Sequence, residues 1–444
     1  MIGRLSALLA GLFLLLATVP ACAAPQALLG ATLLDGNGGP PLADSVILID
    51  GERITAVGRR DAIEIPQDAE VVSLAGMTVL PGLIDLQVRL SELGHGSRAR
   101  WQEAYLSLAE RIVMPAAAEE LLRSGVTTAR DVGSPLEAAL AIRERIAMRR
   151  IPGPTLYVSG PVLEHDPPAR DHARRWPLAG AADARQKVER LARAGVNLVV
   201  VAAPDLLSDA ELAAIDGAAH AAGLSWYAEL RADADIVRAL NAGAAGLLGL
   251  GGGTTEDLPE PALAALRARA ARGAPASWTA GASLLTNYEW LRLDAGPLAE
   301  PRLYTGMPPI VAEDVRRSLL DLATHIDLET PALRGAVLAG RLQAGRAAGA
   351  RLLAGSDAGE PAHLPARATW QEVEALVLQG HLTPAEAIRA ATLDAAVELG
   401  IDRDTGSIVA GKYADIIAVH GNLLRHIARL QDVELVIHRG LRVR

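Results

Sequence analysis

The chain has 444 residues, of which 50% are hydrophobic, and its formal net charge is −9. This length is enough for one large domain with a smaller one appended. The charged residues form no long run of one sign, and a nucleic-acid-binding chain would need a basic face, so we expect no nucleic-acid partner. Phenylalanine occurs once, which leaves Leu, Ile, Val and Ala to build the core.

The first 23 residues have the pattern of a secretory signal peptide. Arg4 precedes an apolar stretch from Ala7 to Val19, and small residues follow it. A membrane anchor is the alternative, but the apolar stretch is shorter than the ~20 residues that a span requires. We therefore expect an exported protein that is periplasmic or lipid-anchored to the bacterial envelope.

Two processing routes fit the end of this segment. Residues 21–23 read Ala-Cys-Ala, an A-x-A site that would be cut before Ala24, whereas residues 19–22 resemble a lipobox that would place a lipid on Cys22. Cys22 is the only cysteine in the sequence. A lipid there would attach the protein to a membrane, and the mature chain can form no structural disulfide in either case.

Both ends of the mature chain have the pattern of β-strands. In the N-terminal part, residues 45–49 and 53–57 flank Asp50-Gly51, a dipeptide that supplies the positive φ of a tight hairpin turn. Strand patterns recur near the C-terminus, at residues 415–419 and 433–438. Neither end has enough strands to bury a sheet face alone.

Between these ends, expected strands alternate with expected helices. The strands are expected at residues 83–85, 126–131, 155–158, 197–201, 226–230, 244–250, 276–280 and 351–357. Alternation at this spacing favours a parallel α/β sheet, either closed as a barrel or open and doubly wound. The segment 287–332 fits the alternation least well, and we expect a longer loop there.

The stretch 79–90, VLPGLIDLQVRL, carries a family resemblance. An apolar run ends at Pro81-Gly82, and Leu83-Ile84-Asp85 follow. This resembles the signature of the amidohydrolase superfamily, in its imidazolonepropionase-like and Xaa-Pro-dipeptidase-like branch, which reads PGxID and then His-x-His. The chain also resembles the family at residues 125–133, 383–392 and 406–415.

The resemblance implies a fold and an activity. The implied fold is a (β/α)8 TIM-type barrel over residues 81–405, beside a composite β-sandwich formed by residues 24–80 and 406–444. Barrels of this type keep their chemistry at the C-terminal ends of the strands. The implied activity is hydrolysis of amide-type C–N bonds by water that a divalent metal activates.

Most positions that would hold the metal carry other residues in this chain. The substituted positions are Gln87 and Arg89 on the first strand, where the family has two histidines, Val200 on the fourth, and Glu229 and Gly249 on the fifth and sixth. An amide is a poor ligand, and a guanidinium has no lone pair to offer. Only Asp357, in the eighth-strand motif Gly-Ser-Asp-Ala-Gly, keeps the family residue.

A barrel mouth without its metal has a charge to balance. Asp357 would be partly desolvated there, and an unpaired buried charge is costly. We hypothesise that Arg89 occupies the vacated metal position and pairs with Asp357 and Glu229, with Arg231 adding a second cation. The simpler alternatives are a solvated loop arginine at position 89, a solvent-facing glutamate at position 229 and a structural aspartate at position 357.

The candidate site residues follow from these positions. Asp357 and Glu229 are the candidate catalytic residues, because a carboxylate pair can do acid–base work without metal, although adjacent arginines would hold both ionised. The candidate binding residues around the mouth are Gln87, Arg89, Asp131, Arg231 and His363. For His363, which follows the eighth strand, a solvated loop position is the alternative.

Three functions fit this pattern. The first, which we favour, is a metal-free exported pseudoenzyme that binds a small molecule or a partner protein at the barrel mouth and needs no cofactor. The second is a hydrolase of C–N bonds with a rearranged site or a single divalent metal such as zinc, built from Asp357 and Glu229. The third is a structural envelope protein that keeps the fold for packing, since a fold does not by itself carry a function.

Overall fold

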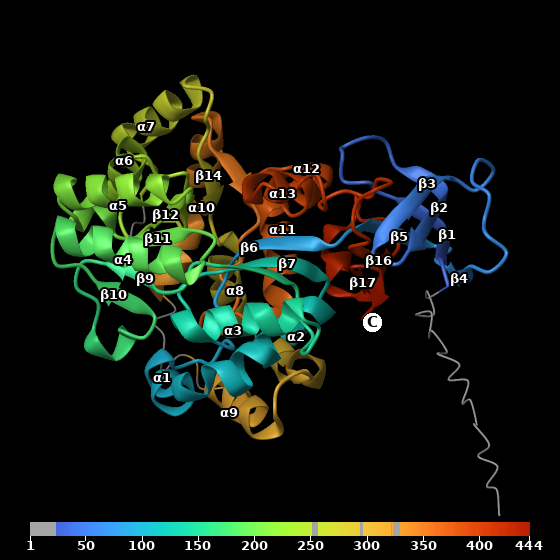
Figure 1. The fold of residues 1–444 in the computed structure, drawn as a ribbon, viewed down its shortest axis with the longest axis horizontal. Helices are drawn as coiled ribbons and strands as arrows, with labels where there is room; N and C mark the ends of the chain where they lie inside the picture. The colour runs from blue at the N-terminus through green and yellow to red at the C-terminus, as the bar shows by residue number, and fades with distance from the viewer. Residues whose placement is uncertain (1–23, 251–255, 294–295, 321, 323–328) are drawn as a thin grey trace, which may run out of the picture.

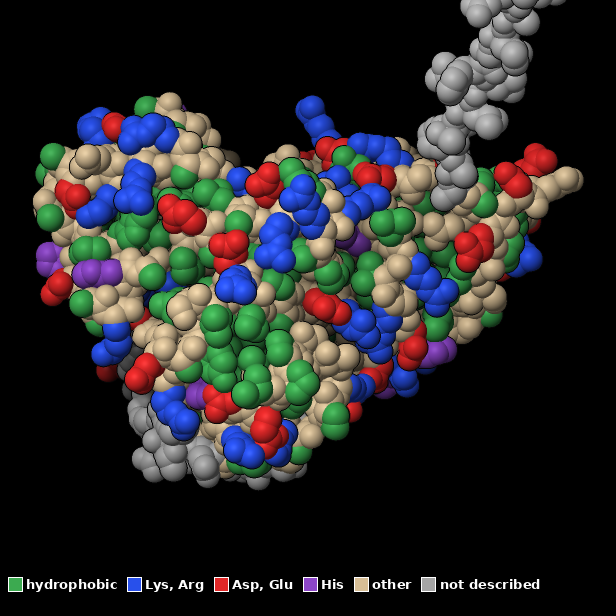
Figure 2. Space-filling model, turned by 60° about the horizontal axis from the view of Figure 1, so that its bottom comes forward, with side chains coloured by type: hydrophobic (Ala, Val, Ile, Leu, Met, Phe, Trp, Pro, Cys, Tyr) green, Lys and Arg blue, Asp and Glu red, His purple; other side chains and the backbone are tan. Residues whose placement is uncertain are grey.

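The computed structural model describes residues 24–250, 256–293, 296–320, 322 and 329–444. The expected signal peptide and the lipobox cysteine Cys22 lie outside these residues. Figure 1 shows a β-rich layer at one end of the molecule and a larger body of strands and helices at the other. On the face drawn in Figure 2, acidic and basic side chains are interspersed. In the described part of the chain, no helix is both long and apolar enough to cross a bilayer.

Eight parallel strands form the centre of the larger body. They are β6 (Leu83–Val88), β7 (Val126–Asp131), β8 (Thr155–Val158), β11 (Val199–Ala202), β12 (Trp226–Glu229), β13 (Gly246–Leu248), β14 (Ser277–Thr279) and β15 (Arg351–Leu353). Hydrogen bonds link neighbouring strands in two sets. One set has the order β6-β7-β8, and the other has the order β11-β12-β13-β14-β15. Strand β11 reads VVVA and is wholly buried, as expected for a parallel strand that is covered on both faces.

Two backbone hydrogen bonds join these sets into a closed circle. The amide of Asn197 donates to the carbonyl of Val158 over 2.9 Å, which connects β8 to the start of β11. The amide of Asp357, just beyond β15, donates to the carbonyl of Gln87 on β6 over 2.7 Å. The predicted (β/α)8 barrel is therefore confirmed, and the open doubly wound sheet is excluded.

Helices surround this barrel. Those in the described part of the chain are α1 (Arg98–Tyr105), α2 (Met114–Arg123), α3 (Leu136–Ala147), α4 (Ala181–Ala194), α5 (Asp209–Ala221), α6 (Asp233–Ala242), α7 (Glu260–Ala271), α8 (Ala282–Leu293), α9 (Pro309–Leu320), α10 (Glu329–Ala347), α11 (Pro365–Leu378), α12 (Pro384–Ala390) and α13 (Leu393–Leu399). Local sequence sets several boundaries. Gly195 ends α4 in the left-handed conformation, and Ser208 opens α5 through a capping box with Glu211.

The longer loop expected within residues 287–332 lies between α8 and α9, where the described residues 296–308 form only two short 3-10 helices and turns. Helices α8, α9 and α10 cover half of that segment, and the strand spacing did not predict them. The signal was present in α9, where the buried residues Val311, Val315 and Leu319 recur at the four-residue spacing of one helix face. Strand spacing alone could not show that three helices precede the last barrel strand.

A second sheet combines both ends of the chain. Its strands are β1 (Gln26–Leu33), β2 (Leu42–Asp50), β3 (Arg53–Arg59), β4 (Glu70–Ser73), β5 (Met77–Pro81), β16 (Ile416–His420), β17 (Val433–His438) and β18 (Leu441–Arg442). The order is β18-β17-β16-β5-β1-β2-β3, with β4 paired to β1. C-terminal β16 pairs antiparallel with N-terminal β5, so Ile416 lies opposite Pro81. Strand β5 then runs into β6, which carries the chain from this sheet into the barrel (Figure 1).

Candidate functional site at the barrel mouth

Two chain segments that are far apart in sequence lock together at the mouth. Asp85 on β6 accepts hydrogen bonds from the backbone N and the hydroxyl of Ser356, at 3.0 and 2.6 Å. Asp357 follows with φ at 61°, in the left-handed region that non-glycine residues rarely adopt. At Gly359, an added Cβ would lie 2.5 Å from the carbonyl O of Arg89, so only glycine fits. The end of β6 and the turn after β15 therefore hold each other in register.

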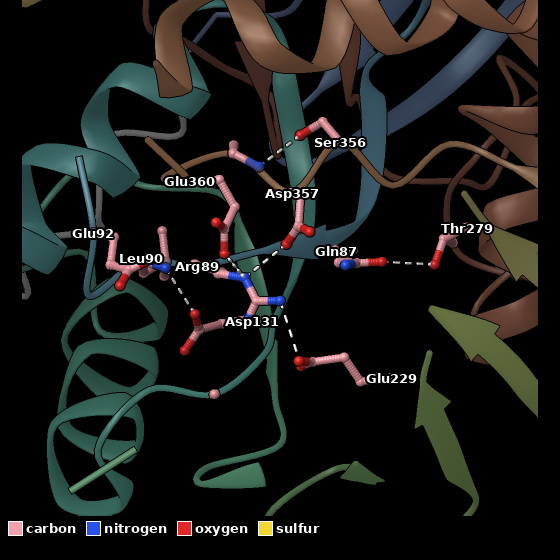
Figure 3. A network of polar contacts seen from close by, with 12 residues as sticks. Gln87, Arg89, Leu90, Glu92, Asp131, Glu229, Thr279, Ser356, Asp357 and Glu360 are labelled. Carbon is pink, nitrogen blue, oxygen red and sulfur yellow. Dashed lines mark hydrogen bonds and ion pairs between the residues drawn. The ribbon is translucent and has the colours of Figure 1, made fainter. Parts of the chain in front are cut away.

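Arg89 lies at the centre of the polar network that results (Figure 3). Its Nε is 2.7 Å from Oδ1 of Asp357 and 2.8 Å from Oε1 of Glu360. Its Nη2 is 3.4 Å from Oε2 of Glu229, which is the last residue of β12. The predicted pairing of Arg89 with Asp357 and Glu229 is confirmed. The solvated alternatives for positions 89 and 229 are wrong, because both residues are buried.

Arg231 takes a different partner from the one expected. Its Nη2 is 2.7 Å from Oε1 of Glu164, and half of its side chain is exposed. The second cation on Glu229 is instead Arg175, whose Nη2 donates to Oε1 over 2.6 Å. Arg175 also donates to Oε2 of Glu164 over 2.8 Å, so it joins the two glutamates. It comes from β10 (Arg175–Pro177), a short strand that pairs with β9 (Val162–Glu164) beside the barrel.

A further layer of ion pairs surrounds the turn after β15. Glu360 contacts Arg98 of α1 as well as Arg89. Glu92, almost completely buried, lies 2.5 Å from Nη1 of Arg174 and 3.6 Å from Nε of Arg98. Sequence reasoning missed these residues. The one available signal was position, since Glu360 stands three residues after Asp357 and Glu92 three after Arg89.

The arginines decide the charge state of the buried acids. Burial alone would raise the pKa of Glu229, but the guanidiniums of Arg175 and Arg89 hold it well below its ordinary value. Glu360 differs, because burial raises its pKa despite the nearby arginines. For Arg89, the surrounding carboxylates raise the pKa although burial alone would lower it. At neutral pH Glu229 is therefore a carboxylate and Arg89 a fixed cation.

The other predicted binding residues serve the architecture of the mouth. Gln87 points inward and its Oε1 accepts a hydrogen bond from Thr279 on β14 over 3.0 Å (Figure 3). Asp131, at the end of β7, accepts from the backbone N of Leu90 and from Ser134, each at 2.9 Å. Burial raises the pKa of Asp131 to about 6.

His363 is fully buried, so the solvated loop alternative is wrong. Neither of its ring nitrogens has a hydrogen-bond partner among the described residues. Burial lowers its pKa to about 3, which leaves the imidazole neutral at physiological pH. A neutral imidazole can bind metal, but His363 belongs to no group of potential metal ligands among the residues that the structure describes.

The side chains at the mouth, as placed, do not fit a divalent metal. Within the described ranges, no group of three or more His, Cys, Asp or Glu residues is arranged to hold an ion. At the positions that the family resemblance assigns to ligands, Asp357 and Glu229 already share the guanidinium of Arg89, and Val200 is buried in an apolar cluster. A metal beside Asp357 would meet a fixed positive charge within hydrogen-bonding distance.

Comparisons with known proteins agree with this architecture. A family model described as the amidohydrolase family matches residues 78–246 and 331–443. A solved structure from Bifidobacterium longum, described as a candidate prolidase, is 26% identical with a TM-score of 0.70, and the match covers 95% of each chain. A Xaa-Pro dipeptidase with bound methionine is 21% identical with a TM-score of 0.71, covering 94% of this chain and 99% of that one. No curated protein matches the sequence.

Proposed function

Because the chain belongs to the amidohydrolase family, we propose that it is a metal-free member whose barrel mouth binds a small molecule or a partner protein without hydrolysing it. The observation that carries this proposal is the contact of 2.7 Å between Nε of Arg89 and Oδ1 of Asp357. Asp357 is the one position at which the sequence retains the family's ligand. The guanidinium of Arg89 occupies the space beside this carboxylate.

The charge states support the same proposal. Hydrolysis of an amide needs an activated water and a polarised carbonyl. A guanidinium can polarise a carbonyl, but it cannot act as a base. Glu229 is a poor base as well, because two arginines hold its pKa well below the ordinary value. The mouth therefore has cations for binding an anion, and Glu229 is not suited to activating water.

The alternative is a hydrolase of C–N bonds with a rearranged site or a single divalent metal such as zinc. Asp357, Glu229 and Glu360 bring three carboxylates to one guanidinium, and a metal could displace that guanidinium if Arg89 turned away. Two of the similar solved structures are described as a prolidase and a Xaa-Pro dipeptidase, which favours this alternative for those proteins.

Elemental analysis of the purified protein separates the two. We expect substoichiometric zinc, manganese and iron, and no turnover of Xaa-Pro dipeptides or acylated amino acids after metal is added. One equivalent of metal that is lost in Asp357→Asn, together with hydrolysis, would overturn the proposal. The Asp357→Asn variant also shows whether any bound metal uses this site rather than the surface.

We further propose, on the basis of the leader sequence, that the protein is exported and is either periplasmic after cleavage before Ala24 or lipid-anchored through Cys22. Cell fractionation of the wild type and of Cys22→Ala tests this. If Cys22 carries a lipid, the wild type partitions with membranes and incorporates radiolabelled palmitate, whereas Cys22→Ala does neither. A wild type that stays in the soluble periplasmic fraction would instead indicate cleavage before Ala24.

A further inference from the structure

A small cavity of about 210 Å³ lies beside Arg89 at the barrel mouth. Its wall includes the start of α1 and the loop between β9 and β10. Most of its charged lining residues are arginines, namely Arg89, Arg98, Arg170, Arg174, Arg175 and Arg231. Only two acids, Asp171 and Glu360, share the wall. The wall therefore carries an excess of positive charge.

Three of the carboxylates that pair with these arginines lie outside the cavity wall, whereas the wall residues Asp171 and Glu360 pair with Arg174, Arg98 and Arg89. Glu92, Glu164 and Glu229 are buried and are not part of the cavity wall. Glu92 holds Arg174, while Glu164 and Glu229 together hold Arg175. Carboxylates outside the wall fix the direction of a guanidinium while leaving some of its N–H groups for another acceptor.

Each guanidinium has five N–H donors, and the ion pairs use only part of them. Arg175 engages Nη1 and Nη2 once each. Arg174 likewise engages Nη1 and Nη2 once each, and its buried Nε has no hydrogen-bond partner within the described residues. Each of these guanidiniums therefore keeps N–H donors that no described residue accepts, although buried donors are normally satisfied.

Two further arginines line the cavity and have few ion-pair partners among the described residues. Arg170 is exposed and forms no ion pair with any described residue. Arg231 is half exposed and has one ion pair, with Glu164. Both can turn toward a ligand at small cost, while Arg174 and Arg175, which ion pairs hold in place, provide a fixed floor.

We propose that this cavity binds a small dianion, such as a dicarboxylate or a phosphate group. Guanidinium groups match carboxylate and phosphate oxygens through paired hydrogen bonds. The volume is below that of ordinary drug-sized pockets, which excludes large ligands. Ala99 and Pro168 are the only apolar lining residues, so the wall offers little to a hydrophobic ligand.

This inference names the ligand class for the mouth and rests on the proposed function only in placing a small molecule there. The two can fail separately. Stoichiometric metal would overturn the metal-free proposal, and the anion-binding measurement would still decide whether the cavity binds a dianion. Absence of anion binding in a metal-free protein would overturn only the inference made here.

Isothermal titration of the purified protein at constant ionic strength tests the site. The probes are succinate, inorganic phosphate and, as a monoanion, acetate. We expect saturable binding of succinate or phosphate that is at least about tenfold tighter than that of acetate. Binding of one dianion and not the other identifies whether the site takes carboxylates or phosphate.

Variants at the cavity edge make the test specific. Arg231→Gln and Arg170→Gln should each weaken binding about fivefold, because each removes one charge-assisted partner. Asp171→Asn should tighten binding, since it removes a negative charge from the wall. The matched control is Arg193→Gln, an exposed arginine on α4, which should leave binding unchanged. No saturable binding by the folded wild type, or equal effects of the edge and control variants, would overturn the proposal.

Discussion

The Nε atom of Arg89 donates a hydrogen bond to Oδ1 of Asp357 over 2.7 Å, across 268 residues of sequence. The pair ties the end of β6, the first barrel strand, to the turn after β15, the last (Figure 3). The same guanidinium also contacts Glu229 and Glu360. A single side chain therefore contacts three carboxylates where the barrel closes.

Replacing Arg89 by methionine should strongly destabilise the protein. The methionine fills a similar volume but leaves Asp357, Glu229 and Glu360 without this shared cation. Breaking a buried ion pair from one side costs about 3–5 kcal/mol, so the free energy of unfolding in Arg89→Met should fall by this amount. Urea unfolding at pH 7, followed by circular dichroism, measures it.

The matched control is Arg193→Met, at an exposed arginine of α4 whose ion pair lies on the helix surface. Its effect should stay within about 0.5 kcal/mol. Adding Asp357→Asn to Arg89→Met should recover part of the lost stability, because one unpaired charge is removed. If Arg89→Met unfolds at the same urea concentration as the control, the guanidinium is not what balances these acids.

The barrel strands could be predicted because their sequences are locally consistent. Strand β7 reads VTTARD between Gly125 and Gly133, and both glycines adopt positive φ. The hairpin of β2 and β3 follows from Asp50-Gly51 in the same way. Patterns of this kind depend on residues that are close in sequence, and the fold class followed from them once the family resemblance was added.

The candidate site was only partly predictable. The pairing of Arg89 with Asp357 follows from their positions in two motifs. Arg175 could not be placed, because its approach to Glu229 depends on how the loop after β8 folds back as β10. Glu360 depends on the left-handed turn at Asp357, a conformation that nothing in the residue type predicts.

Restoring the family's two histidines should create a metal site. The variant Gln87→His/Arg89→His removes the guanidinium and places two imidazoles on β6, near Asp357 and Glu229. Two imidazoles with one or two carboxylates suit zinc. We expect about one zinc per chain by equilibrium dialysis followed by elemental analysis. Gln87→His alone keeps Arg89 and should bind none, and zinc in that variant would show that the guanidinium is no obstacle.

Asp131 should stabilise the protein through its hydrogen bond to the backbone N–H of Leu90, just after β6. Its Oδ1 accepts from the backbone N of Leu90 and from Ser134, both buried. Asp131→Ala leaves the N–H of Leu90 unsatisfied and should cost about 1–3 kcal/mol in the free energy of unfolding. Asp131→Asn keeps an oxygen at this place and should cost less.

Hydrogen exchange gives the readout specific to this contact. The amide of Leu90 should exchange faster in Asp131→Ala than in Asp131→Asn or the wild type, as measured by mass spectrometry of peptides that span the end of β6. Unchanged exchange at Leu90, with equal loss of stability in both variants, would mean that Asp131 acts through its charge rather than through this hydrogen bond.

Glu372 should make the protein less stable as the pH rises toward neutrality. It lies on α11 and is fully buried, and it accepts hydrogen bonds from the backbone N of Ser283 at 2.8 Å and of Ala282 at 3.3 Å at the start of α8. Burial raises its pKa from 4.5 to about 7. Below pH 4.5 both folded and unfolded states hold the proton, so the stabilising contribution is fully present there. Between pH 4.5 and 7 the unfolded state ionises first, and the contribution is lost.

A shift of this size corresponds to about 3 kcal/mol in the free energy of unfolding between pH 4.5 and 7. Urea unfolding of the wild type and Glu372→Gln across this range should give a difference that changes by this amount, because the glutamine cannot titrate. Asp131, whose pKa is also raised, remains in both proteins and cancels from the difference. Glu103→Gln, at an exposed position on α1, is the matched control. A difference between wild type and Glu372→Gln that stays constant with pH would show that Glu372 is already ionised in the folded protein, held by the two amides at the start of α8.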